Sequence, residues 1–582
     1  MTDLANITTK KIISFLLLLF FFIFLGACAE GKALPQSNAA ERPSNDPELA
    51  ALPYALREDG RKTVLSAAAN EWFATAATCV PCHQNIKGSS GVEFDPAERW
   101  RASMMANAAR DPYFRASVAY EVEKSPQYAT EIEEKCATCH TPMARYSALA
   151  RGQSIALVSD QNVYNLQHPD HRLAMDGVSC TVCHQIPPLS GANARNSGDL
   201  AIDLTTPYGT RPLYGPFPMS RQSVSMMAGA SGYEPVESEH VRQSSLCATC
   251  HELYLHYLRA DGSLSQGEET FPEQTPYSEW LESDYVDQRS CQDCHLSRAE
   301  EALPISNVTP QNRYAGISQH NFLGGNATML SLLNNFAGEL GVEADTRHFR
   351  NVIAETLDFV TERTATLEIL NPQVQDGILT FELAISNLSG HKFPTGFPSR
   401  RAWLHIVVTD AQGKLIFESG GYDPQGRILE NDNDLDPSRF EPHYERITSS
   451  QEVQIYESIM HNIQQEVTTV QLHAAGYLKD NRLLPLGFDK VSAPNHIAVV
   501  GDALNDKNFL AGGDILTVQV DVSQAELPLQ LRCELLYQTI GYRWAENVIA
   551  GANLLAMNFA RYWQETPAIP LLIAAQALEI GR

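Results

Sequence analysis

Ten of the twelve cysteines of this chain fall in five pentapeptides of the form Cys-x-x-Cys-His. Two thiols at this spacing can add across the vinyl groups of a haem, and the histidine that follows can bind the iron. Each box therefore predicts one covalently attached c-type haem. The predicted thioether cysteines are Cys79, Cys82, Cys136, Cys139, Cys180, Cys183, Cys247, Cys250, Cys291 and Cys294. The predicted proximal iron ligands are His83, His140, His184, His251 and His295.

Other chemistry of paired cysteines fits these boxes less well. A zinc site needs two pairs that close on one ion, and it has no fixed histidine after the second cysteine. A thioredoxin-like redox motif does not recur five times in one chain. A disulfide framework would not place a histidine after every second cysteine. The prediction is therefore five c-type haems and five iron ions.

The first residues predict export. Lys10 and Lys11 precede an apolar run from residue 12 to residue 25, which is the order of a secretory signal. Leu25-Gly26-Ala27-Cys28 also resembles the bacterial lipobox, in which the cysteine is acylated. We predict a signal peptide over residues 1–27 and a lipid on Cys28 that anchors the protein without spanning the membrane. An ordinary signal with a stray cysteine, or an uncleaved anchor, is the alternative.

Export agrees with the chemistry, since c-type haem is attached outside the cytoplasm. By resemblance to enterobacterial sorting rules, Ala29 after the cysteine favours the outer membrane of a Gram-negative bacterium, on its periplasmic or cell-surface face. The formal charge of −26 argues against nucleic acid as a partner. An acidic redox protein should instead meet partner proteins through a basic docking face.

The length of 582 residues indicates more than one domain. Residues 28–66 are polar and contain Pro, Ser and Asn, which is typical of a flexible tether. Residues 67–347 hold the five boxes and should form a mainly helical haem domain. Within it, Glu98 to Lys124 has a helical pattern, with Trp100, Phe114 and Val118 among its apolar positions.

Beyond the boxes the pattern changes to alternation. Short alternating runs with glycine turns predict strands and a β-sandwich over residues 360–545. The runs lie at 366–370, 379–385, 404–408, 414–417, 515–520 and 531–535. Residues 546–582 should form a closing helical segment. The predicted fold class is α+β, and Cys533, which alternates with apolar neighbours, should be a buried inert thiol.

The chain resembles the multihaem cytochrome c superfamily, which includes the tetrahaem cytochrome of ammonia oxidisers, hydroxylamine oxidoreductase and pentahaem nitrite reductase. The closest likeness is to exported pentahaem cytochromes with a C-terminal β-domain. The stretches that carry it are Asp176–Ser179, Tyr277–Leu281, His320–Asn326 and Gly390–Gly396. In pentahaem nitrite reductases the catalytic haem usually has Lys in place of the box histidine. All five boxes here end in His, which makes that reaction a weaker expectation.

A six-coordinate haem needs a second axial ligand, and imidazole or thioether suits iron. His320 precedes a glycine pair that would let the backbone approach a haem face. His168 and His171 flank Pro169-Asp170, and we prefer His171 to His168. Met104 follows the first box and could ligate the first haem, although we slightly prefer to interpret it as a core methionine.

The resemblance implies two further distal ligands. They are His240, which lies before the fourth box, and His391, which would reach from the β-domain onto a haem. A surface histidine and a structural turn histidine are the respective alternatives. The sequence as a whole predicts an exported electron carrier with no catalytic residues of its own. The alternative is an oxidoreductase acting on a small nitrogen or sulfur compound at one open-coordinate haem.

Overall fold

The structure is a computed structural model that describes residues 52, 54–57, 64–89, 93–159, 161–189 and 195–581. The chain divides into two units, Met1–Leu52 and Pro53–Arg582, and the second is a single compact unit. The predicted signal peptide and Cys28 lie outside the described residues. Within the described part, no helix is both long and apolar enough to cross a membrane.

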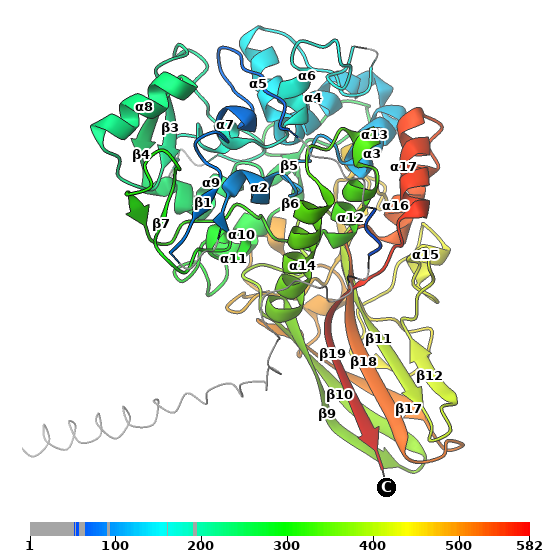
Figure 1. Ribbon diagram of the computed structural model, residues 1–582. Helices are drawn as coiled ribbons and strands as arrows, with labels where there is room; N and C mark the ends of the chain where they lie inside the picture. The colour runs from blue at the N-terminus through cyan, green and yellow to red at the C-terminus, as the bar shows by residue number, and fades with distance from the viewer. Residues whose placement is uncertain are drawn as a thin grey trace, which may run out of the picture. The chain divides into compact units, whose positions relative to one another are not determined.

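The boxes lie in a region of short helices and two-stranded sheets, drawn above the long strands in Figure 1. Its helices are α2 (Pro96–Trp100), α3 (Pro112–Lys124), α4 (Ala129–His140), α5 (Pro142–Ala150), α6 (His171–Met175), α7 (Cys180–Cys183), α8 (Arg221–Ser231), α9 (Ser244–Ala248), α10 (Pro276–Leu281), α11 (Cys291–His295), α12 (Ala327–Asn335), α13 (Ala337–Leu340) and α14 (Thr346–Arg363). Its strands are β1 (Ile86–Lys87), β2 (Glu93–Phe94), β3 (Arg211–Gly215), β4 (Tyr233–Glu237), β5 (Leu253–Leu255), β6 (Phe271–Gln274), β7 (Leu303–Pro304) and β8 (Arg313–Tyr314), which pair two by two.

The helix expected over Glu98–Lys124 is divided into two. Helix α2 ends at Trp100, and α3 begins at Pro112, with Asp111 as its N-cap. Proline fixes φ and has no N–H, so it suits the first helical position and disfavours helix at the residue before it. Met104 therefore lies on the turns between the two helices and not on a helix.

Two larger sheets follow the boxes. One has the strand order β13 (Arg446–Ile447), β17 (Gly513–Asp521), β10 (Ile378–Asn387), β9 (Ala365–Gln375). The other has the order β12 (Leu415–Ser419), β11 (Arg401–Thr409), β18 (Leu529–Gln538), β19 (Leu571–Ile580), with β14 (Ile455–Tyr456) also paired to β11. A separate pair joins β15 (Ser458–His461) and β16 (Gly476–Asp480).

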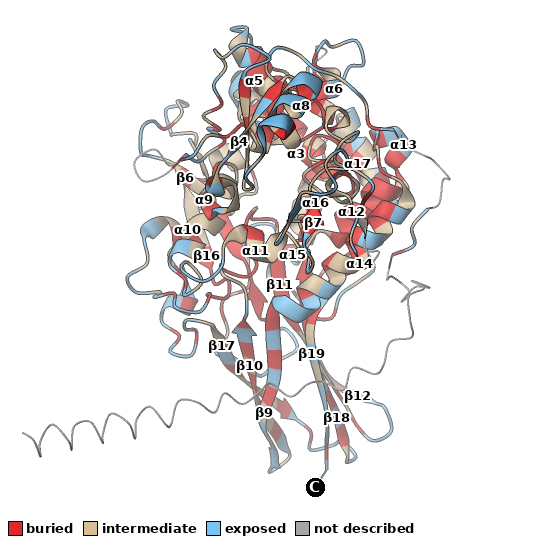
Figure 2. Ribbon diagram, turned by 60° about the vertical axis from the view of Figure 1, so that its left-hand side comes forward, coloured by how far each residue is buried: buried red, intermediate tan, exposed pale blue. Residues whose placement is uncertain are grey.

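Alternation along the strands explains their burial. Leu379, Phe381 and Leu383 of β10 are buried, and they lie opposite Val520, Val518 and Leu516 of β17. Figure 2 shows the resulting alternation of buried and exposed residues along these strands. The alternation gives this sheet one buried and one exposed face, and the β-sandwich expected from the two sheets stays a prediction. Asp376 and Gly377, both at positive φ, form the tight turn between β9 and β10.

The end of the chain differs from the expected helical segment. Helices α16 (Tyr542–Ile549) and α17 (Leu554–Glu565) form, but residues 571–580 make strand β19, antiparallel to β18. Thr566-Pro567 ends the helix, since the residue before a proline avoids helical backbone. Leu571 and Ile573 then alternate inward on the sheet. The prediction of a helical segment over residues 546–582 is therefore wrong for residues 571–580, which form a strand.

From residue 54 on, the described part of the predicted tether belongs to the compact unit. The Tyr54 hydroxyl lies 3.0 Å from that of Thr328, and Leu65 is buried. The Arg57 backbone N–H donates to Asn335 at 2.9 Å. These residues pack against the haem-box region, so the flexible-tether prediction is wrong for this part of residues 28–66.

Candidate functional site

All five boxes face one cavity. It has a volume of about 2090 Å³, and its walls include the ten box cysteines and the five box histidines. An ordinary small-molecule site measures roughly 300–1,000 Å³, so this cavity is large enough for several prosthetic groups. The box cysteines are half-buried because they face it.

Four of the five box histidines share a hydrogen-bond pattern that suits metal ligation. The Nδ1–H groups of His83, His184 and His295 donate to the carbonyls of Ile305, Tyr214 and Leu323, at 2.7, 2.6 and 2.6 Å. His140 makes a longer bond of this kind, 3.3 Å, to Ala108. A carbonyl can only accept, so the proton is on Nδ1 and the Nε2 lone pair is free to bind a metal.

Burial also keeps these imidazoles neutral. It lowers the pKa of His140 and of His251 to about 4, and for His251 the nearby Arg400 guanidinium adds to the effect. The pKa of His83, His184 and His295 is lowered for the same main reason. A metal ligand must be unprotonated, so the five histidines are in the required state at neutral pH.

Two box histidines face a second imidazole. The ring centroids of His184 and His320 are 6.3 Å apart, with 24° between the ring planes. Those of His295 and His391 are 6.2 Å apart, with 13° between the planes. Imidazole nitrogen binds transition metals at about 2 Å, and a ring centroid lies roughly 1 Å behind its nitrogen, so two rings on opposite sides of one ion are about 6 Å apart. Both pairs therefore have the separation that a bis-imidazole iron requires.

The two facing histidines have the same second contact as the box histidines. Nδ1–H of His320 donates to the Ser318 carbonyl at 2.8 Å, and Nδ1–H of His391 donates to the Lys392 carbonyl at 2.9 Å. The His320 backbone has φ of +59°, which turns the loop toward the third box. His391 and His320 thus face box histidines, and their roles as distal ligands stay predictions.

The remaining predicted distal ligands lie elsewhere. His240 has Nδ1 bonded with Ser238 at 2.7 Å and Nε2 bonded with the Ile186 carbonyl at 2.9 Å. Both nitrogens are occupied and the ring is not on the cavity wall, so we correct the prediction that His240 is a ligand. His171 donates Nδ1–H to the Val163 carbonyl at 2.9 Å and is also off the cavity wall. Met104 lines the cavity, and its place opposite His83 stays a prediction.

Sequence reasoning missed the charged residues on the cavity wall, among them Glu121, Lys135, Glu273 and Arg400. Burial raises the pKa of Glu273 to about 8 and that of Glu121 to about 7. The Glu273 Oε2 atom is buried and has no hydrogen-bond partner. Glu273 lies in the short strand β6 between Pro272 and Gln274, and its sequence neighbours carry no signal of its burial.

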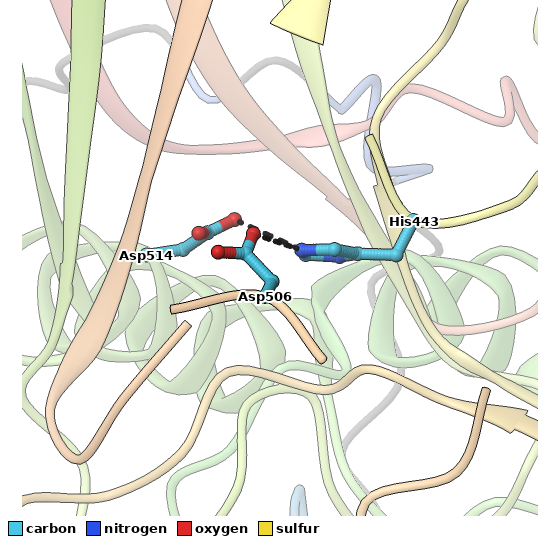
Figure 3. Close-up of side chains that lie close together, drawn as sticks. All are labelled: His443, Asp506 and Asp514. Carbon is cyan, nitrogen blue, oxygen red and sulfur yellow. Dashed lines mark hydrogen bonds and ion pairs between the residues drawn. The ribbon is translucent and has the colours of Figure 1, made fainter. Parts of the chain in front are cut away.

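A second cluster, in the β-region, has a composition that could hold a metal ion (Figure 3). His443, Asp506 and Asp514 are buried, and one ligand atom from each lies within 4.8 Å of the others. Nε2 of His443 lies 3.0 Å from Asp506 Oδ2 and 3.9 Å from Asp514 Oδ2.

The tautomer of His443 argues against a metal there. Its Nδ1 accepts hydrogen bonds from the side-chain amides of Gln454, at 2.9 Å, and Asn481, at 3.1 Å. Each amide oxygen in turn accepts a backbone N–H, which fixes the orientation of both amides. The proton is therefore on Nε2, where it donates to Asp506 and leaves no lone pair for an ion. We interpret the cluster as a buried polar network that supports the β-region.

Comparison with known proteins gives one similarity. No protein-family model matches the chain, and no curated protein matches it. Among solved structures, the chain is similar to a penta-heme cytochrome c552 from Thermochromatium tepidum. The two share 15% sequence identity with a TM-score of 0.46, over 87% of this chain and 98% of that chain.

Proposed function

We propose that the protein is a multihaem c-type cytochrome that carries electrons through five covalently bound haems. One observation carries the proposal: all fifteen box thiols and imidazoles line a single cavity, and two of the imidazoles face a second imidazole at 6.3 and 6.2 Å. A haem, when bound, supplies the reversible one-electron chemistry. The chain's own residues fix its place and tune its potential through axial ligand, burial and hydrogen bonding.

Neighbouring thiols support an order for the five sites. A hydrogen bond with Cys180 raises the pKa of Cys79, which supports a first site that adjoins the third. In the same way the thiol of Cys250 raises the pKa of Cys139, and that of Cys291 raises the pKa of Cys247. The second and fifth boxes therefore both adjoin the fourth.

The thiol of Cys183 also contributes to the raised pKa of Cys247. This connects the third box to the fourth and completes a path from the first site through the third to the fourth. The fourth site is then a junction with three neighbours. A junction of this kind would let electrons that enter at one end leave at either of two others.

A potentiometric titration followed by visible spectroscopy tests the carrier proposal. The matured protein should take up five electrons in successive one-electron steps, and its oxidised spectrum should not change when cyanide or nitrite is added. Reduction by fewer than five electrons, or uptake without the α-band of a c-type haem, would contradict it.

A second candidate function is an oxidoreductase acting on a small nitrogen or sulfur compound at an open haem. The observation that favours it concerns the fourth box. Among the described residues no imidazole faces His83, His140 or His251 as His320 faces His184. Of these three, His251 has the Arg400 guanidinium close enough to lower its pKa. A cation beside an open iron would attract an anionic substrate. A high-spin ferric band that cyanide abolishes would favour this function.

We also propose export with a lipid anchor on Cys28 and attachment to the outer membrane, supported by the sequence of the first 28 residues. Replacing Cys28 with Ser should release the haem protein into the soluble fraction. Retention of the variant in the membrane would indicate an uncleaved anchor. A partner with a basic docking face should react more slowly as salt is raised, because the net charge of −26 steers the encounter.

A further inference from the structure

Four charged side chains are buried together behind His391. They are Glu279, Lys392, Asp480 and Arg482, none more than 7% exposed. Lys392 Nζ donates to Asp480 Oδ2 at 2.7 Å. Arg482 donates to both oxygens of Asp480, at 2.8 and 2.7 Å, and its Nη1 lies 2.9 Å from Glu279 Oε1. Two anions and two cations balance, as buried charges must.

Glu279 joins this cluster to the loop that carries His391. Its Oε2 accepts the Lys392 backbone N–H at 3.1 Å and the Thr395 hydroxyl at 2.5 Å. The carbonyl of Lys392 is in turn the acceptor for His391 Nδ1–H. The peptide units on both sides of Lys392 are thus held, one by Glu279 and the other by the histidine ring itself.

Glu279 is also close in sequence to His295, the imidazole that His391 faces. It belongs to α10, and the segment after α10 leads directly to the fifth box and His295. Trp280 and Tyr285 of this segment pack against Gly390, where an added Cβ would lie 3.3 Å from each. One short stretch, residues 279–295, therefore contacts the His391 loop and carries the imidazole that His391 faces.

We infer that the Glu279–Lys392–Asp480–Arg482 cluster positions His391 as the distal ligand of the fifth haem and thereby tunes the potential of that haem. The inference rests on the proposed function, in which His295 and His391 bind one iron. These four are positioning residues, since none of them reaches the iron. Four buried charges are a costly way to hold a loop, and through Glu279 they hold the Lys392 N–H that follows His391.

The test removes one pair of the cluster and keeps the charge balance. In the double variant Glu279→Leu/Arg482→Met, Lys392 and Asp480 still form a neutral buried pair, but the Lys392 N–H loses its acceptor. The matched control is Arg401→Met/Asp434→Leu. It removes an equally buried pair, with bonds of 2.9 and 2.9 Å, that does not contact the His391 loop.

Both doubles should lower the thermal stability of the matured five-haem protein. Only Glu279→Leu/Arg482→Met should shift the midpoint potential and the low-spin EPR signal of one haem. That haem should be the one that becomes high-spin in His391→Ala. If that double leaves every haem signal where the control leaves it, the cluster is structural and the inference falls. If His391→Ala itself changes no spin state, the ligand assignment fails first.

A milder variant keeps the test open should the first double not fold. Thr395→Val removes only the hydroxyl donor to Glu279 and leaves all four charges in place. It should shift the same EPR signal by a smaller amount. An unchanged signal in Thr395→Val, together with unchanged folding, would count against the inference.

Discussion

Replacing His391 with Ala should convert one of the five haems to high spin and leave the other four unchanged. The structure sets the size of the effect. Among the box histidines, all of which lie in the described part of the chain, His391 faces His295 alone, at 6.2 Å. A single iron of the proposed five should therefore lose its distal imidazole. Haem attachment should be complete, because Cys291 and Cys294 are untouched. The freed iron should bind carbon monoxide when reduced, and its axial ligation should no longer be bis-imidazole.

Spin-counting EPR of the oxidised protein is the assay, with carbon monoxide binding by the reduced protein as a second readout. His461→Ala is the matched control. His461 is also in the β-region and also donates Nδ1–H to a carbonyl, that of Asn462 at 2.7 Å, but it is not on the cavity wall. An unchanged spin count in His391→Ala, or the same change in His461→Ala, would refute the reasoning.

Three further predictions concern other histidines and one buried acid. His320→Met should keep all five haems attached but raise the potential of one of them, because thioether ligation raises potential relative to imidazole; five unchanged potentials would remove His320 from the ligand set. His240→Gln, which can keep the hydrogen bonds to Ser238 and Ile186, should leave every haem signal unchanged. A new high-spin signal in this variant would show that His240 is a distal ligand after all. Burial raises the pKa of Asp514 from 3.8 to about 7, so the contribution of this carboxyl to stability should fall as pH rises from about 4 to 7. Asp514→Asn should lack this loss and be more stable than the wild-type protein at pH 8 by up to about 4 kcal/mol, at roughly 1.4 kcal/mol for each pKa unit. Denaturant unfolding of both proteins at pH 4 and pH 8 measures the difference. The same pH dependence in both proteins would show that the pKa of Asp514 is not raised by burial.

The sequence was most informative where residue type alone sets the chemistry. The Cys-x-x-Cys-His spacing is typical of c-type haem attachment, so the boxes predict haem sites without knowledge of the fold. Alternation of apolar and polar residues likewise predicted runs that lie in β9, β10, β11, β17 and β18. The Asp376-Gly377 turn was also predictable, because few residue pairs tolerate positive φ at two successive positions.

Contacts between distant segments could not be predicted. Nothing near His240 in the sequence shows that its Nε2–H donates to the carbonyl of Ile186, which is 54 residues away. The Glu279 cluster joins residues 279, 392, 480 and 482, and each of these looks like an ordinary surface charge in the sequence. The strand β19 was missed for a related reason: its partner β18 supplies the pairing that local helical propensity does not reveal.

The helix expected over Glu98–Lys124 shows a different limit. The apolar spacing is present in α3, but Pro112 begins a new helix within the longer apolar pattern. A single proline preceded by Asp is stronger evidence than a hydrophobic period, because it removes a donor and restricts the residue before it.

The central claim is that the cavity holds five covalently attached haems. Intact mass of the matured protein, combined with pyridine haemochrome absorbance per chain, tests it most directly. The account predicts a mass increase of five haems and a haemochrome ratio of five, each lowered by one when a single box loses both cysteines, as in Cys180→Ala/Cys183→Ala. A fully matured chain with four haems or fewer, or a mass unchanged by that substitution, would contradict it.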